Sequence, residues 1–351
     1  MDLQLLLLRR QYLQLVEPDF LAWPPNSLLR DANAQSWIYK RLFDPERTPR
    51  LPPAHYQIRV LKPLLAKIEQ SIDDPEEDEI SDALMSHFSS LIARELPPET
   101  TAVQQKTYVT FSCLPPSTSL SALSEEEGEE PTVTLLERRY LISGSQTTGF
   151  RTWEAALHLG SYLMTPAGRT LVRGKSVLEL GAGTGFLSIL CAKHLQAKHV
   201  TSTDGDEGVV ESLRENLFLN ELDDEEKVLT SILRWGRAIK GTWTEEDCEA
   251  WPYDVVVGAD ITYDKRAISA LIATLRMLFE MRPQLEVIIS GAVRKAETFE
   301  TFRYACLHSQ FVLEEVDFQP KPMREQIALF YATAVPLKLL RIIGPHSAGN
   351  I

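Results

Sequence analysis

The first hundred residues alternate apolar and polar positions at the spacing of amphipathic helices. Apolar side chains recur at helical intervals over residues 3–16, 35–43, 54–72 and 80–95, which gathers them on one face of each helix. Proline-rich breaks separate these stretches at Trp23-Pro24-Pro25, 49–53 and 96–98, and prolines of this kind end helices. We therefore predict a mainly helical N-terminal region over residues 1–104.

Two short β-like stretches follow this region. Residues 106–114 and 132–142 are rich in apolar and β-branched side chains, which favour strands. The segment between them is rich in serine and ends in Glu125-Glu126-Glu127-Gly128-Glu129-Glu130. A like-charged segment of this composition buries no apolar core. We predict a β-hairpin over residues 105–144 that carries a mobile acidic loop.

From about residue 145 the pattern changes to strands that alternate with helices. Most of the strand-like runs are apolar and β-branched, as in strands that are buried on both faces. This alternation predicts βαβ units with right-handed crossovers. Strands are expected at 176–180, 199–203, 228–233, 253–258, 286–290, 311–318 and 326–333, and helices at 186–195, 207–220, 265–280 and 296–308.

The predicted fold class is therefore α/β, with a Rossmann-like, seven-stranded and mostly parallel sheet over residues 145–340. The last strand should be antiparallel to the one before it, because residues 319–325 are too few for a crossover helix.

Composition narrows the classes of partner. The chain has 36 Lys and Arg against 49 Asp and Glu, a net charge of −13, which argues against non-specific nucleic-acid binding and favours a basic protein partner. No apolar run reaches the roughly 18–20 residues of a membrane span. The four cysteines are scattered without a C-x-x-C pair, as in reducing compartments. We expect a cytoplasmic monomer without nucleic-acid or membrane partners.

A glycine loop is the first chemical motif. A predicted strand runs directly into Gly181-Ala182-Gly183-Thr184-Gly185, and glycines there let the backbone turn tightly and approach a ligand. The dinucleotide fingerprint needs a small residue where Phe186 stands, so the loop does not match that motif. No G-K-[ST] follows the loop, which excludes a phosphate-cradling P-loop. Glu179, on the strand before the loop, suits a cationic or amine-bearing ligand better than a pyrophosphate.

A second acidic position follows at the end of the next predicted strand. Asp204 lies about 20 residues past the glycine loop, where a carboxylate can accept hydrogen bonds from both hydroxyls of a ribose. Asp206 is the alternative. Either aspartate could instead cap the helix that begins at Glu207.

These residues resemble the seven-strand, S-adenosylmethionine-dependent methyltransferases. The resemblance is carried by Glu179-Leu-Gly-Ala-Gly-Thr-Gly185, by Asp204, and by the segment 254–260 that leads into Ile261-Thr262-Tyr263. Within that class, Asp260-Ile-Thr-Tyr263 is similar to the D-x-x-Y motif of eukaryotic lysine methyltransferases. Trp153-Glu154 and Trp235 match two further segments of that group.

The N-terminal region adds a finer resemblance. Its leucine-rich start, Trp23-Pro24-Pro25 and the helical stretch before the α/β domain are similar to the elongation factor 2 lysine methyltransferases. This resemblance implies that the acceptor is a lysine of a protein, elongation factor 2. It also makes residues 1–104 a candidate for substrate recognition.

The resemblance also implies roles for single residues. Asp260 and Tyr263 would be catalytic, with the tyrosine ring lining a channel for the acceptor lysine. No metal is implied. The methyl donor S-adenosylmethionine would be held by Trp153, Glu179, Gly181, Gly183, Gly185, Asp204, Trp235 and Asp260. Structural alternatives stay open: a packing role for each tryptophan, a helix-terminal charge for Glu154, and a helix cap for Asp260.

Three other functions remain possible at this level. The chain could methylate another protein, or a nucleic acid or small molecule, or it could bind the donor without turnover as a scaffold. Amino-methylating enzymes of nucleic acids usually carry a Pro-Pro pair after the fourth strand, and Ile261-Thr262 stands there instead. This difference and the acidic charge favour a protein acceptor.

Overall fold

The structure is a computed structural model that describes residues 2–74, 76, 78–94, 105–118, 130–139 and 148–345. The chain divides into two units. One comprises Met1–Ser112 with Thr118–Ile142, and the other comprises Cys113–Ser117 with Ser143–Ile351. Among the described residues, no helix is both long enough and apolar enough to cross a membrane.

The first unit is built on a small helical core. Each of the four predicted helical stretches contains a helix, and the aromatic rings of Tyr12, Phe43 and Tyr56 meet at its centre, with centroids 5.1 and 5.6 Å from that of Tyr12. The helices are α1 (Leu3–Leu13), α2 (Asn26–Leu29), α3 (Ala32–Ile38) with the π-helical turn Tyr39–Phe43, α4 (Ala54–Ser71) and α5 (Asp82–Ile92).

The predicted hairpin is present in the same unit. Strand β1 (Thr107–Ser112) pairs antiparallel with β2 (Thr132–Glu137). Most of the acidic loop, 119–129, lies outside the described residues. Its last residue, Glu130, accepts a hydrogen bond from Ser112 Oγ at 3.1 Å and forms an ion pair with the buried guanidinium of Arg10. This carboxylate therefore offsets a buried charge.

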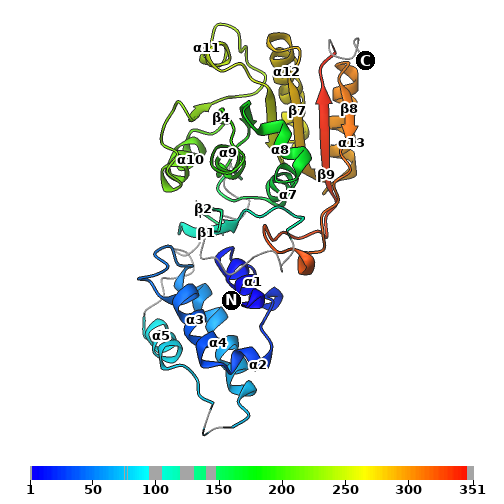
Figure 1. Cartoon of the computed structure of the whole chain (residues 1–351). Helices are drawn as coiled ribbons and strands as arrows, with labels where there is room; N and C mark the ends of the chain where they lie inside the picture. The colour runs from blue at the N-terminus through cyan, green and yellow to red at the C-terminus, as the bar shows by residue number, and fades with distance from the viewer. Residues whose placement is uncertain are drawn as a thin grey trace. The chain divides into compact units, whose positions relative to one another are not determined.

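The second unit contains the predicted seven-stranded sheet (Figure 1). Neighbouring strands are parallel except β9, which is antiparallel to both of its neighbours, β7 and β8. In spatial order the strands are β5 (Val228–Ile232), β4 (His199–Asp204), β3 (Ser176–Leu180), β6 (Val255–Ala259), β7 (Glu286–Ala292), β9 (Leu337–Ile343) and β8 (Val312–Glu315).

The predicted strand at 326–333 is wrong, and the last strand is Leu337–Ile343. Leu329 has a φ of 47°, which an extended strand cannot contain. Tyr331 donates its backbone N–H to Gln326 Oε1 at 2.8 Å, and its hydroxyl lies 3.2 Å from His158 Nδ1. The apolar side chains of this segment are therefore buried by a packed loop, which a local hydrophobic pattern does not distinguish from a strand.

Helices cover both faces of the sheet. Alternate strand residues such as Leu178, Val256 and Ile289 share one core with α12 and α13. Helix α7 contacts β6, β7 and β9, and α9 contacts β3 and β4. The four helices predicted in this unit are present as α9 (Phe186–Lys193), α10 (Glu207–Leu219), α12 (Lys265–Met281) and α13 (Ala296–His308). The pattern missed α7 (Glu154–Leu163), α8 (Pro166–Val172) and α11 (Trp243–Ala250).

The strand order places a crevice at the centre of the sheet. From β3 the chain proceeds outward through β4 and β5, and then returns to place β6 on the other side of β3. Ligands of open α/β sheets bind at such a reversal, beyond the carboxyl ends of the strands. The glycine loop leaves β3 at this point.

Candidate active site

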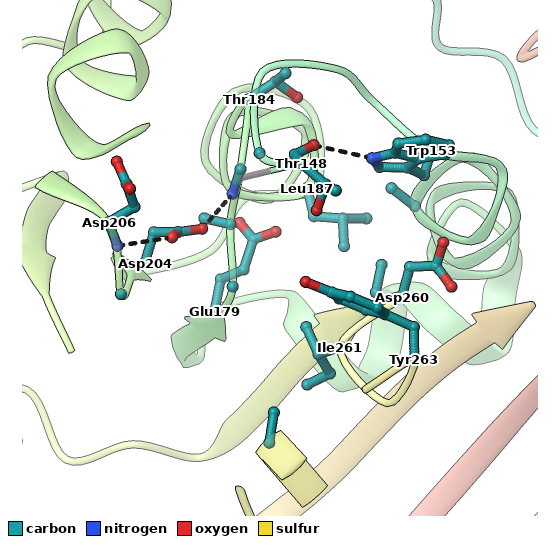
Figure 2. A pocket seen from close by; sticks show the side chains of 18 of the residues that line it. Thr148, Trp153, Glu179, Thr184, Leu187, Asp204, Asp206, Asp260, Ile261 and Tyr263 are labelled. Carbon is teal, nitrogen blue, oxygen red and sulfur yellow. Dashed lines mark hydrogen bonds between the residues drawn. The ribbon is translucent and has the colours of Figure 1, made fainter. Parts of the chain in front are cut away.

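A cavity of about 620 Å³ lies at the carboxyl ends of the central strands. Figure 2 shows Asp204 and Glu179 toward one side of it and Trp153 and Asp260 toward the other, with the ring of Tyr263 directed inward. Every predicted site residue except Gly185 lines the cavity: Trp153, Glu179, Gly181, Gly183, Asp204, Trp235, Asp260 and Tyr263.

Gly181 keeps one wall of the cavity open. Its φ is 66°, a left-handed conformation that glycine adopts without steric cost. A Cβ at this position would lie 2.7 Å from Ile261 Cγ2 and 3.5 Å from Trp235 Cζ2. Any larger residue would therefore crowd the apolar wall that Ile261 and Trp235 form.

Gly185 serves the packing behind the loop. It caps the N-terminus of α9 with a φ of 84°, and a Cβ would lie 2.2 Å from Leu213 Cδ1 on α10. Gly185 thus lets two helices approach each other and positions the loop indirectly. The sequence placed it among the ligand contacts because spacing alone does not show which glycine faces the cavity.

Asp204 and Asp206 have different structural roles. Asp204 accepts hydrogen bonds from the backbone N–H of Gly183 and of Asp206, each at 3.1 Å. Asp206 accepts from the N–H of Val209 at 3.0 Å and is the N-cap of α10. Burial raises the pKa of Asp204, and the backbone donors partly offset that rise. Both carboxylates line the cavity. The half-buried Asp204 is held against the glycine loop, whereas Asp206 also caps a helix.

Glu179 is almost fully buried, with 2% of its surface exposed. Its Oε2 accepts hydrogen bonds from the backbone N–H of Ser188, at 2.9 Å, and from the Ser188 hydroxyl. Burial raises the pKa of Glu179 to about 8, against the lowering effect of these hydrogen bonds. At neutral pH this carboxyl group therefore holds a proton in the free protein.

Asp260 has a strained backbone that aims its side chain at the cavity. Its φ of 55° is unusual for a residue other than glycine, although aspartate tolerates it better than most. The adjacent strand β7 holds this conformation: Asp260 N–H donates to Ser290 O at 2.8 Å, and Ala292 N–H donates to Asp260 Oδ1 at 3.3 Å. Strain that neighbours maintain in this way is typical of functional sites.

Trp153 lies among charged groups that the sequence analysis did not bring together. Its indole N–H donates to Thr148 O at 3.0 Å. The guanidinium groups of Arg151 and Arg294 lie 5.0 and 5.3 Å from its ring centroid, within the range of cation–π attraction. Both arginines also lie within 4.0 Å of Glu154. Glu154, the first residue of α7, therefore acts in this charge cluster.

Arg294 is the main residue that sequence reasoning missed. Its Nη1 lies 2.9 Å from Asp260 Oδ2. A signal existed: Arg294 follows β7, the strand beside the one that leads into Asp260, and adjacent parallel strands end at the same edge of a sheet.

A second missed contact joins the hydroxyls of Thr152 and Thr184, which are buried and 2.7 Å apart. This contact ties the segment before α7 to the glycine loop.

Known proteins are similar to this chain in sequence. A family described as lysine methyltransferase matches residues 140–304. The chain is 46% identical to protein-lysine N-methyltransferase EFM3 of Chaetomium thermophilum over 95% of each chain. It is 30% identical to protein-lysine N-methyltransferase EEF2KMT of Homo sapiens over 60% of this chain and 63% of that one. It is 34% identical to EEF1A lysine methyltransferase 3 of Mus musculus over 47% of this chain and 64% of that one.

Proposed function

Since this chain belongs to the protein-lysine N-methyltransferase family, we propose that its acceptor is a lysine of eukaryotic elongation factor 2. Membership of this family rests on the 46% identity to EFM3 of Chaetomium thermophilum over 95% of both chains. The choice of acceptor is supported by the match to EEF2KMT, which spans 60% of this chain against 47% for EEF1A lysine methyltransferase 3. An elongation factor acceptor also supports a cytoplasmic location, as do four buried free thiols.

S-adenosylmethionine is the methyl donor of this family, and the cavity suits its chemistry. We propose that Asp204 accepts the ribose hydroxyls and that the flat ring of Trp235 packs on the purine. Glu179 would meet the ammonium group of the donor's amino acid end. The space beside Gly181, which a Cβ would close, supports this fit.

The donor supplies an electrophilic methyl group on a sulfonium, and the protein must present an unprotonated amine to it. The new N–C bond forms as the C–S bond breaks, the bonding electrons stay on sulfur, and the nitrogen passes its proton to water. Lysine has an ordinary pKa of about 10.4, and a channel of low polarity favours its neutral form.

We propose that catalysis rests mainly on positioning, which in well-oriented systems lowers barriers by up to roughly 7–11 kcal/mol. The ring of Tyr263 would guide the alkyl chain of the acceptor lysine, and Asp260 would orient its nitrogen. The 60% exposure of Tyr263 supports a role at the mouth of the cavity, where an acceptor must enter.

The acceptor is tested with two purified elongation factors side by side. Elongation factor 2 and elongation factor 1A, both from cells that lack this chain, are incubated with it and radiolabelled S-adenosylmethionine. We expect label on one lysine of elongation factor 2, located by mass spectrometry, and none on elongation factor 1A. Heat-denatured enzyme is the control. Label on elongation factor 1A alone would overturn the proposed acceptor and leave the family intact.

We propose that residues 1–104 recognise the acceptor protein. This role is supported by the cavity, whose lining residues all lie between 148 and 294, so that chemistry and recognition can be divided along the chain. Hydrogen–deuterium exchange should show slower exchange in α1–α5 when elongation factor 2 is added. Unchanged exchange there, with slower exchange at the cavity, would reject the role.

Glu179 should couple donor binding to proton release. The ammonium of the donor, placed next to Glu179, favours the ionised carboxylate, so binding at pH 7 should release up to about one proton, and fewer as the pH rises past 8. Calorimetry in buffers of different ionisation enthalpy measures this number. Glu179→Gln should abolish the release and keep the fold, because glutamine has the shape of the protonated acid.

The same shift predicts how stability depends on pH. The folded pKa of Glu179, about 8, lies above its ordinary 4.5, so its contribution to the free energy of unfolding is complete below 4.5 and is lost as the pH rises through 8. Glu179→Gln should remove this part of the dependence in thermal unfolding. Identical curves for variant and wild type would contradict a protonated Glu179.

A further inference from the structure

Arg294 is held at the mouth of the cavity by three contacts. Its guanidinium lies 2.9 Å from Asp260 Oδ2, 3.6 Å from Glu154 Oε2 and 5.3 Å from the centroid of the Trp153 ring. These partners come from the β6–α12 connection and from the start of α7. A long side chain fixed from two directions has a defined position relative to the cavity that it lines.

Each oxygen of the Asp260 carboxylate already accepts a hydrogen bond in the free protein. Its Oδ1 accepts from the backbone N–H of Ala292 and its Oδ2 from Arg294. Only 10% of the Asp260 side chain is exposed, against 43% of the Arg294 side chain. An arriving lysine ammonium would therefore meet a compensated carboxylate beside a guanidinium.

Charge compensation matters for this reaction because only the neutral amine is a nucleophile. A lone carboxylate near the acceptor nitrogen favours the ammonium form. A guanidinium has the opposite effect and stays charged at any pH used for an assay. Compensating the carboxylate keeps its shape for hydrogen bonding and removes its preference for a cation.

Two other charged groups around Asp260 are ion-paired as well. The Arg151 guanidinium lies 3.9 Å from Glu154 Oε1, and Lys265, at the start of α12, is ion-paired with Glu297 of α13. Across the cavity, Glu179 holds a proton at neutral pH in the free protein and should ionise against the donor's ammonium once the donor is bound. The half-buried Asp204 accepts two backbone hydrogen bonds. The remaining titratable groups that line the cavity are Asp206, Arg234 and Tyr263. Asp264, Arg266 and Lys295 stand close to Asp260 or Arg294 in the sequence and do not line it.

We propose that Arg294 is a positioning residue that keeps the carboxylate of Asp260 charge-compensated, so that the acceptor lysine meets the methyl donor as a neutral amine. This inference rests on the proposed function and adds a residue that acts on the acceptor through Asp260. It predicts an effect on the pH dependence of turnover, which loss of a structural contact alone would not produce.

The test is the pH profile of kcat for Arg294→Gln, measured from pH 6.5 to 10 with saturating protein acceptor. We expect the midpoint to move alkaline by about one pH unit and kcat near pH 7.5 to fall about 10-fold, with recovery at high pH. The KM for the acceptor should not rise. Arg294→Lys, which restores a cation, should restore most of the midpoint.

Arg303→Gln is the matched control, because Arg303 is an exposed arginine on α13 that is paired with Glu300 at 3.0 Å and does not line the cavity. Its profile should equal that of the wild type. Circular dichroism and affinity for S-adenosylhomocysteine verify that each variant is folded.

Two results would overturn the proposal: an equal loss of kcat for Arg294→Gln at every pH, or an unmoved midpoint. Neither would affect the proposed function, which the labelling by the wild type tests separately. If the wild type labels a protein other than elongation factor 2, the same profile is measured on that acceptor.

Discussion

Asp260→Asn is expected to lower kcat for methyl transfer by about 100-fold or more, the effect of misplacing a reacting group by roughly an ångström. Asparagine tolerates the left-handed backbone of this position and can still accept the Ala292 N–H, so the loop should keep its shape. The variant loses the negative charge that pairs with Arg294 at 2.9 Å. Steady-state assays with radiolabelled donor measure the loss.

Asp264→Asn provides the control for this loop. Asp264 caps α12 by accepting the N–H of Arg266 at 2.9 Å, and it does not line the cavity. The same chemical change four positions away should leave kcat within about 2-fold, with only a small loss of capping stability. An Asp260→Asn enzyme as active as this control would remove Asp260 from the reaction.

A double-mutant cycle separates Asp260 from its partner. If Asp260 and Arg294 act together, the combined variant should lose much less than the product of the two single losses. If the fold-loss of kcat in the double variant equalled the product of the two single losses, Asp260 and Arg294 would act independently, which would contradict a coupled pair.

Asp204→Ala is expected to weaken binding of S-adenosylhomocysteine by about 100-fold or more, because hydrogen bonds to a charged group contribute about 1.5–3 kcal/mol each. The change would remove the carboxylate for two ribose hydroxyls and leave the N–H groups of Gly183 and Asp206 without the acceptors seen at 3.1 Å. Titration calorimetry measures the Kd directly.

Asp206→Ala distinguishes the two aspartates. It removes the cap on the Val209 N–H, which should lower the free energy of unfolding by about 1 kcal/mol and change the Kd only a few-fold. If Asp206→Ala weakened binding as much as Asp204→Ala, the ribose would be bound by both aspartates or by Asp206.

The fold could largely be predicted from local patterns because burial on two faces imposes a composition on each strand. The fully buried strand Ser176–Leu180 before Gly181 and the amphipathic helix that the structure places at Lys265–Met281 are examples. The pattern failed at Leu329, whose neighbours are equally apolar and yet form a packed loop. An apolar run reports that a segment is buried, and it does not report whether the backbone finds a partner strand.

The site was partly predictable for a related reason. Parallel strands end at one edge of the sheet, so acidic residues at predicted strand ends should converge, and Glu179, Asp204 and Asp260 do line one cavity. Whether Asp204 or Asp206 holds the ribose was left open by the sequence, because both stand beside the same helix start. Both line the cavity, and the structure adds only that Asp204 binds the glycine loop whereas Asp206 caps α10.

By itself, the sequence of this protein determined the alternation of strands and helices, the glycine loop and the set of carboxylates at strand ends, because these depend on neighbours a few residues apart. Only the tertiary structure decided that Arg294 pairs with Asp260, that Gly185 packs against Leu213, and that the last strand begins at Leu337. Those contacts join residues far apart in the chain, and their geometry exists only once the strand order brings the elements together.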